Sequence, residues 1–141
     1  MSIFAKTVTV EMLNERFQLP HMGTFLGIEF TEVGEHHLAA RMPVNERTHQ
    51  PMGILHGGAS VVLAETLGSV GGWLVLTDDS KTCVGLEINA NHIRSVSSGY
   101  VTGRATPLHI GRNTQVWEIK ITNEKKQLVC ISRLTLAVVG K

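Results

Sequence analysis

The segment from Ala59 to Leu76 constrains this chain most, because its residues are almost all apolar, small or hydroxylated and it contains a single carboxylate, Glu65. Its length is close to that of a membrane-spanning helix. Glu65 would cost roughly 2.5 to 3.5 kcal/mol at the centre of a bilayer, and the hydroxyls of Ser60, Thr66 and Ser69 add polarity. The segment therefore predicts a buried core helix of a globular protein, without a membrane partner.

Glu65 needs an explanation within such a helix. An ionised carboxylate taken out of water costs several kcal/mol unless it is paired, hydrogen-bonded or neutral. One interpretation is structural, with an arginine or backbone donors satisfying it. The other is chemical, because a poorly solvated carboxylate close to an acyl carbon is a good nucleophile or general base. Ser69 lies one turn later, and its hydroxyl can form a hydrogen bond with Glu65 or with a polar group of a substrate. Alternatively, it bonds only to the helix carbonyl four residues earlier.

The rest of the chain is dominated by residues that alternate with a period of two, which is typical of strands. Expected strands cover residues 26–33, 36–44, 82–93, 99–110, 113–122 and 127–139. The first two form a hairpin at Gly34. In the third, Val84, Leu86 and Ile88 share one face, and the last four strands follow one another through hairpin-length turns, three of them as a meander. An antiparallel sheet wrapped around the long helix would bury it on all sides.

A short helix over residues 10–17 precedes the strands, with Thr9 as its N-cap. The chain of 141 residues, 43% of them hydrophobic, predicts one domain, 1–141. Thirteen basic and twelve acidic residues give a net charge of +1 without a charge run, which argues against a nucleic-acid partner. The N-terminus lacks a signal peptide, so a cytoplasmic location is expected. Cys83 and Cys130 indicate reduced thiols, and without an HExxH motif no metal is expected.

The residues at the start of the long helix predict an anion-binding corner. The N–H groups of Gly57 and Gly58 lie where helix donors are unsatisfied and the helix dipole is positive, so they can hold an oxyanion; a tight turn is the structural alternative. Gly57 and Glu65 are separated by about 12 Å along a helix, whereas a reacting carbon needs both within about 3 Å. We therefore expect each site to form between two chains whose long helices run antiparallel across a two-fold axis.

Two further polar residues flank this corner. His56 can donate a hydrogen bond to a carbonyl oxygen or, alternatively, cap the loop. Gln50, in the polar loop before it, can orient a carbonyl or a water. The chain contains no GxSxG motif and neither cysteine lies at a helix start, so a serine or cysteine nucleophile is not indicated.

Several consecutive motifs resemble one known family. The stretches RTHQPMGILHGGASVVLAETLGSVGG, VGLEINANHIRS and PLHIGRNTQVWEI are similar, in residue type and spacing, to hotdog-fold acyl-CoA thioesterases of the 4-hydroxybenzoyl-CoA (Arthrobacter) type. The likeness runs from about Leu26 to Val138. It implies an α+β hotdog fold, an antiparallel sheet around one long central helix, and a homodimer that forms the active site and pairs into a homotetramer.

The resemblance also implies roles for particular residues. Glu65 is the expected catalytic carboxylate, and the Gly57 N–H is the expected oxyanion donor. His56 and Gln50 would align the thioester or the attacking water. Ser69 and Val70 would shape the end of the pocket that holds an aromatic acyl group.

Coenzyme A carries phosphates, so its binding site should offer cations and backbone donors. The NHIRS and LHIGRN segments supply both, at the ends of what we expect to be neighbouring strands, in the region where the family binds the nucleotide. The candidates are His92, Arg94, His109, Gly111 and Arg112. Solvated charges at hairpin ends are the alternative for each of them.

These features predict hydrolysis of an aromatic (hydroxyaryl or hydroxynaphthoyl) acyl-CoA, as in menaquinone synthesis, to the free acid and CoA. No cofactor is expected, because CoA is part of the substrate. Glu65 either attacks the acyl carbon, through an anhydride, or activates a water. The alternatives are a proofreading thioesterase acting on aryl groups mischarged on a carrier protein, a module that binds acyl-CoA without hydrolysing it, and a hotdog dehydratase.

Overall fold

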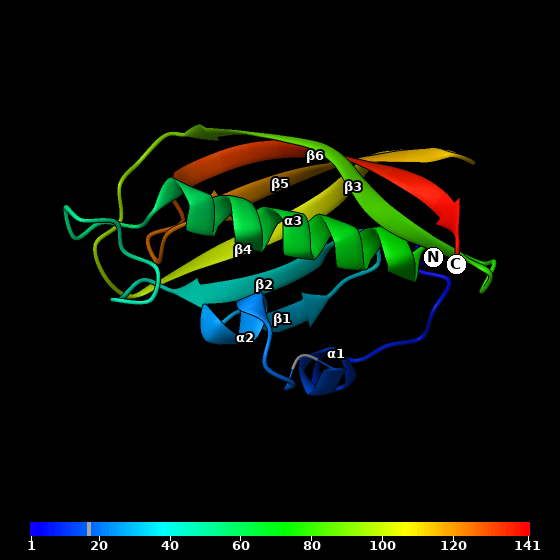
Figure 1. The fold of residues 1–141 in the computed structure, drawn as a ribbon, viewed down its shortest axis with the longest axis horizontal. Coiled ribbons are helices and arrows are strands. Elements are labelled where there is room, and N and C mark those ends of the chain that lie inside the picture. Colours follow the sequence, from blue (N-terminus) through cyan, green and yellow to red (C-terminus); the bar gives the residue numbers. More distant parts are fainter. Residues whose placement is uncertain (17) are drawn as a thin grey trace.

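The long central helix lies on the concave side of one six-stranded antiparallel sheet (Figure 1). The computed structural model describes residues 1–16 and 18–141. In chain order the elements are α1 (Val10–Arg16), α2 (Met22–Phe25), β1 (Glu29–Val33), β2 (Leu38–Pro43), α3 (Gly57–Leu74), β3 (Lys81–His92), β4 (Tyr100–Ile110), β5 (Thr114–Thr122) and β6 (Leu128–Gly140). The predicted α+β class, the β1–β2 hairpin and the β4–β5–β6 meander are confirmed.

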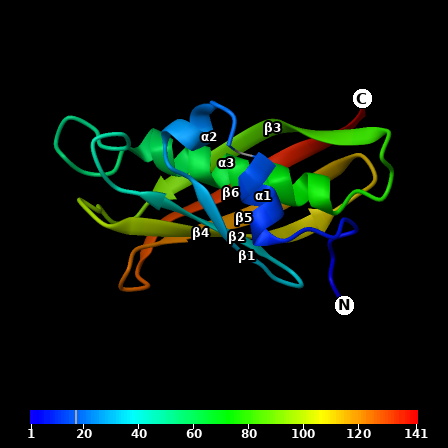
Figure 2. The same ribbon diagram turned by 90° about the horizontal axis from the view of Figure 1, so that it is seen from below.

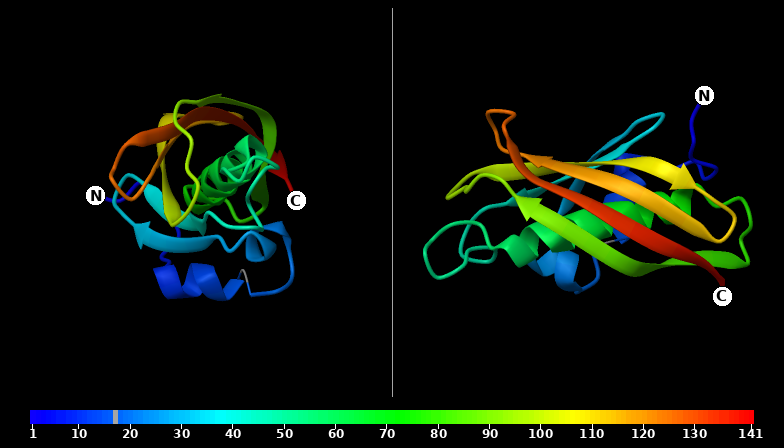
Figure 3. Two further views of the ribbon diagram at one scale, coloured as in Figure 1. Left: turned by 90° about the vertical axis from the view of Figure 1, so that its left-hand side faces the viewer. Right: turned by 90° about the horizontal axis from the view of Figure 1, so that it is seen from above.

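The position of β3 differs from the prediction. The strand order is β1-β2-β4-β5-β6-β3, so β3 pairs with β6 and not with its sequence neighbour β4. Residues 93–99 cross the end of the sheet, and in this stretch the Val96 carbonyl accepts a hydrogen bond of 2.7 Å from the Leu55 N–H. The predicted hairpin-length turn between these strands is therefore wrong. Pairing with β6 lets the sheet curve around α3, as the end view in Figure 3 shows.

A β-bulge inverts the predicted alternation of β3. The register with β6 shifts between Gly85 and Glu87. Cys83 packs on the core before the bulge and Ile88 after it, whereas Val84 and Leu86 are exposed by 47% and 61%. The prediction that Val84 and Leu86 share a face with Ile88 is wrong, because one extra residue changes which side chains point inward.

Small residues let α3 lie close against the sheet. A Cβ at Gly68 would lie 2.5 Å from Leu134 Cδ2, and one at Gly72 would overlap Leu136. Trp117, on β5, is fully buried beneath the helix. The glycines that weaken helix propensity therefore serve packing, which stabilises the helix in the folded chain.

The helix is not buried on all sides, contrary to the prediction. Its sheet-facing residues are buried, but a stripe containing Val62, Glu65 and Ser69 is only half-buried in the single chain. Figure 2 shows α2 beside the N-terminal half of α3. Helix α1 packs against β1, and the guanidinium of its Arg16 lies 4.6 Å from the ring centroid of Trp73, near the C-terminal end of α3. One stripe of α3 is thus left for another function.

The N-terminal region confirms one prediction and adds an element. The Thr9 Oγ1 accepts a hydrogen bond of 3.2 Å from the Met12 N–H, so Thr9 caps α1 as predicted; Phe17, its expected last residue, lies outside the described residues. Helix α2 was not predicted, because four residues carry too short a periodic signal. Among the described residues, no helix is long and apolar enough to cross a membrane.

Both cysteines are free thiols, as predicted. Cys130 is buried and Cys83 is half-buried on β3. Burial raises the pKa of both thiols, because the thiolate is poorly solvated there. Neither thiol is therefore poised as a nucleophile.

Candidate active site

The start of α3 offers one free backbone donor. His56 is the N-cap, with φ −68° and ψ 129°, and its Nδ1 accepts a hydrogen bond of 2.8 Å from the Gly58 N–H. The Gly57 N–H donates to no acceptor within residues 1–16 and 18–141. The expected corner of two glycine donors is therefore reduced to one, at Gly57.

His56 performs the capping role that was one of its two predicted roles. Because Nδ1 accepts a hydrogen bond, the neutral ring carries its proton on Nε2. The His56 side chain is exposed, so this Nε2–H remains free to donate beside Gly57. The cap and the predicted donor role are thus compatible, since they use different ring nitrogens.

Gln50 lies in the loop that leads to His56. Its main chain is held by two hydrogen bonds, from its own N–H to the Ile54 carbonyl at 2.8 Å and from the Gly53 N–H to its carbonyl at 2.9 Å. Its side-chain Oε1 accepts a hydrogen bond from the Met52 N–H. This fixes the amide, and leaves its Nε2 as the group able to donate to a substrate or a water.

Glu65 lies on the half-buried stripe of α3, at the edge of a pocket of about 550 Å³. The pocket is lined by His21, Met22, Gly23, Val62, Glu65, Thr66, Ser69 and Val70. Within the described parts of the chain Glu65 makes no ion pair and no hydrogen bond, and its Oε1 faces Gly85 of β3. The structure therefore supplies no internal partner of the kind that the structural interpretation requires. The predicted residues Ser69 and Val70 lie in the same pocket.

One chain does not bring Gly57 and Glu65 together. Both belong to α3, which runs without a break from Gly57 to Leu74. Eight residues of helix rise about 12 Å, so the free donor and the carboxylate are too far apart to meet at one carbon. The prediction of a site formed by two chains assumed this separation along one continuous helix, and the structure of α3 agrees with that assumption.

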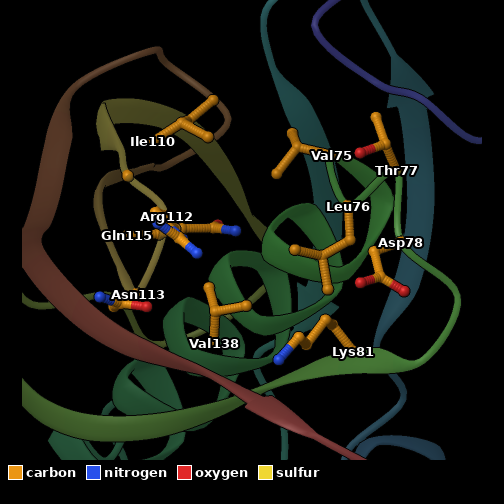
Figure 4. A pocket seen from close by; sticks show the side chains of 11 residues that line it. Val75, Leu76, Thr77, Asp78, Lys81, Ile110, Arg112, Asn113, Gln115 and Val138 are labelled. Atoms are coloured by element: carbon orange, nitrogen blue, oxygen red, sulfur yellow. The ribbon is translucent and has the colours of Figure 1, made fainter.

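The five residues expected to bind CoA fall into two groups. His92 and Arg94 lie beside Gly57 at the start of α3, in a pocket of about 260 Å³. Gly111 and Arg112 line a pocket of about 480 Å³ at the other end of α3 (Figure 4), and His109 packs against Gly111.

The prediction that these residues end neighbouring strands is wrong, because β3 pairs with β6 and not with β4. Their role in binding CoA remains a prediction. Within one chain, His92 and Arg94 are the candidates that lie near the expected oxyanion donor. A Cβ added at Gly57 would lie only 2.8 Å from the His92 Nε2.

Sequence reasoning missed several residues around these pockets. Helix α2 contributes Met22 and Gly23 to the pocket beside Glu65. Gly85 lies against the Glu65 carboxylate, and a glycine inside a strand is a known signal of a bulge or a close approach. Gln115 is fully buried; it donates to the Gly72 carbonyl at 3.1 Å and accepts from the Trp117 indole at 2.9 Å. The sequence did contain a signal for this burial, because Gln115 lies two residues before Trp117 on β5 and therefore on the same face of the strand.

This architecture is that of the hotdog-fold thioesterases, the class that the sequence motifs resemble. The model of the Thioesterase superfamily matches residues 52–130, which include α3, β3, β4 and β5. The chain belongs to this superfamily.

Individual relatives are similar in sequence to this chain along nearly its whole length. The 1,4-dihydroxy-2-naphthoyl-CoA hydrolase of Escherichia coli is 52% identical over 136 residues, covering 96% of this chain and 98% of the relative. A proofreading thioesterase, EntH, of Cronobacter turicensis is 50% identical, covering 98% and 99%. A solved thioesterase structure from Haemophilus influenzae has a TM-score of 0.94 and 53% identity, covering 98% of this chain and 95% of that one. The predicted fold, family and thioesterase activity are confirmed.

Proposed function

We propose that this thioesterase hydrolyses aromatic acyl-CoA, with a hydroxyaryl or hydroxynaphthoyl group, to the free acid and CoA. The observation that carries the proposal is the Glu65 carboxylate, which has no partner among the described residues and borders an apolar pocket. The pocket, of about 550 Å³, has room for an aromatic ring system. Support for the acyl class comes from the relative that is named a 1,4-dihydroxy-2-naphthoyl-CoA hydrolase.

The chemistry requires a carboxylate and an oxyanion donor and no added cofactor. The Gly57 N–H polarises the thioester carbonyl and stabilises the negative charge that develops on its oxygen. Glu65 either attacks the acyl carbon or removes a proton from a water that attacks it. The carbon–sulfur bond then breaks and CoA leaves as a thiolate, which needs no strong general acid because thiols are acidic. When Glu65 is the nucleophile, a water then hydrolyses the resulting anhydride, which releases the free acid and restores the carboxylate. His56 Nε2–H and Gln50 Nε2 orient the carbonyl or the water.

Two chains form each site in this proposal. Antiparallel packing of two α3 helices places the Gly57 of one chain near the Glu65 of the other, and two-fold symmetry makes two such sites. The exposed apolar side chains of Val84 and Leu86 lie on β3, an edge strand, and this supports self-association. Two dimers then pair into a tetramer.

Thiol release from aryl-CoA substrates tests the activity. Wild-type protein is mixed with benzoyl-CoA and hydroxynaphthoyl-CoA, and free CoA is followed with a thiol reagent, alongside Glu65→Gln. We expect release by the wild type and its near loss in Glu65→Gln, because an amide neither attacks nor accepts a proton. If the wild type binds aryl-CoA but releases no CoA, the protein is a binding module and not an enzyme.

The two routes for Glu65 are separated by one isotope experiment. A single turnover is run in ¹⁸O-water, and the Glu65 peptide is analysed by mass spectrometry. Label in Glu65 indicates an anhydride intermediate. Label only in the released acid shows that water attacks the acyl carbon, and direct attack on the thioester is then established if the quenched reaction contains no acylated Glu65 peptide.

A second candidate function is hydrolysis of aryl groups mischarged on a carrier protein. The observation that favours it is the 50% identity to a proofreading thioesterase along nearly the whole chain. The rates on one aryl group attached to CoA and to a carrier protein decide between the two functions. A carrier substrate that gives the larger kcat/KM would favour proofreading.

A further inference from the structure

Gly85 faces the carboxylate of Glu65 from the opposite element. A Cβ built on Gly85 would lie 2.6 Å from Glu65 Oε1 and 3.6 Å from Glu65 Cδ. The next atom, Leu134 Cδ1, is 4.0 Å away. The space in front of Gly85 is therefore filled by the end of one side chain, that of Glu65.

The backbone does not require a glycine at this position. The glycines with positive φ are Gly27, Gly53 and Gly99, and Gly85 is not one of them. Nor does core packing require it, since a Cβ at Gly68 would strike a buried leucine whereas one at Gly85 would strike only the carboxylate. The room left by the missing side chain is occupied by the end of Glu65.

The bulge in β3 places Gly85 in this position. The register shifts directly after Gly85, so the inward-facing residues are Cys83 and Gly85 before the shift and Ile88 after it. Without the bulge, a continuous alternation would place either Cys83 or Ile88 on the outer face of the strand. The strand thus presents its one residue without a side chain to the carboxylate.

We propose that Gly85 is a positioning residue, whose missing side chain forms the niche that holds the Glu65 carboxylate in its reactive orientation between β3 and α3. This rests on the proposed function, in which Glu65 is the reacting carboxylate. A side chain at Gly85 meets only the flexible end of Glu65, so it moves the carboxylate and leaves the fold intact. Displacement by about 1 Å at a reacting group lowers rates by up to about 100-fold.

The test compares Gly85→Ala with wild type by steady-state kinetics on an aryl-CoA, with thermal unfolding and oligomeric state measured on the same samples. We expect kcat to fall about 10- to 100-fold, while KM, the melting temperature and the oligomeric state change little. The matched control is Gly140→Ala, at a strand glycine with nothing within 4 Å of its added Cβ. This control should keep wild-type kcat.

A double-mutant cycle shows whether the two residues act on each other. Glu65→Asp shortens the side chain by one methylene, so the carboxylate withdraws from the niche. Its effect on kcat should be several-fold smaller in the Gly85→Ala background than alone, because both changes displace the same group.

Four results would overturn the role of Gly85: an unchanged kcat in Gly85→Ala, a loss of activity that follows unfolding or dissociation, a fall in kcat matched by the Gly140→Ala control, or additive effects in the cycle. The proposed function fails separately, if Glu65→Gln keeps wild-type kcat. If Glu65→Gln loses activity and Gly85→Ala keeps wild-type kcat, the role of Gly85 is rejected and the proposed function is not.

Discussion

The two faces of α3 differ in what they contact. The sheet face includes these buried residues: Ala59, Leu63, Ala64, Leu67, Gly68, Gly71 and Gly72. The pocket face consists of Val62, Glu65, Thr66, Ser69 and Val70, all half-buried around one cavity. The sheet face has no charged residue, and the pocket face has one carboxylate. One helix thus supports the fold on one side and, in our proposal, the chemistry on the other.

This division explains why the helix looks apolar all round in the sequence. A surface helix shows a polar stripe toward water, but here the second face borders a pocket and, in our proposal, a second chain. Substitutions on the pocket face should therefore change catalysis with little effect on stability. Substitutions on the sheet face should do the reverse.

The largest effect is expected at Glu65. Glu65→Gln should lower kcat by about 10²- to 10⁴-fold, the usual loss when a general base is removed. The melting temperature should stay at the wild-type value or rise, because the substitution removes from a half-buried site a carboxylate that has no partner among residues 1–16 and 18–141. A melting temperature several degrees lower would show that Glu65 also supports the fold, which would break the division between the faces.

Removal of the proposed oxyanion donor, the Gly57 N–H, should have the second largest effect. Gly57→Pro deletes the N–H at the first position of α3, where proline fits a helix well, and the extended φ and ψ of His56 suit a residue before proline. We expect kcat to fall about 10²- to 10³-fold with a melting temperature near that of wild type, because the added Cβ meets the exposed ring of His92, 2.8 Å away, which can rotate. Gly57→Ala, which adds the same Cβ and keeps the N–H, is the matched control and should keep most of the activity. Circular dichroism and steady-state kinetics check both, and unchanged kcat would remove Gly57 from the mechanism.

The sheet face should respond in the opposite way. Gly72→Ala inserts a Cβ that overlaps Leu136 and lies 2.9 Å from the Gln115 Oε1. The free energy of unfolding should fall by about 1–3 kcal/mol, as for other overpacked cores. At a temperature where the variant is folded, kcat should stay near that of wild type. Urea unfolding measures the first quantity, and a large loss of kcat in the folded variant would contradict the division.

The smallest effect concerns substrate preference. Val70→Ala enlarges the pocket beside Ser69, and methyl-sized changes in a pocket shift discrimination by about 1–3 kcal/mol. The ratio of kcat/KM for a naphthoyl-CoA over a benzoyl-CoA should rise about 10-fold. Val61→Ala, a half-buried valine outside the lining of this pocket, is the matched control and should leave the ratio unchanged.

Local patterns were enough to predict most elements. The alternation of Trp117, Ile119 and Ile121 predicted β5 and its buried face, and the apolar run predicted α3. The position of β3 was not predictable, because its pairing with β6 is set by closure of the sheet around α3. The bulge after Gly85 was not predicted either, because the residues on each side of it still show a plausible alternation, as in a regular strand.

The candidate site was partly visible in the sequence in the same way. Glu65 and Gly57 were singled out because a carboxylate in an apolar helix and unsatisfied N–H groups at a helix start are unusual locally, and their catalytic roles remain predictions. Gly85 was not singled out, because its proposed role depends on a contact between elements distant in sequence. His109 and Arg94 were grouped wrongly, since their proximity depended on a strand order that the sequence pattern did not contain.

The central claim is that each site takes its carboxylate and its oxyanion donor from different chains. Glu65→Gln and Gly57→Pro chains, carrying different affinity tags, are co-expressed, and the assemblies that carry both tags are purified. In every dimer that contains one chain of each variant, one of the two sites combines two wild-type halves, so the doubly tagged assemblies should regain activity, up to about half of that of wild type, whereas each parent variant is nearly inactive. Doubly tagged assemblies as inactive as their parents, or a wild-type enzyme that is active as a monomer, would contradict the account.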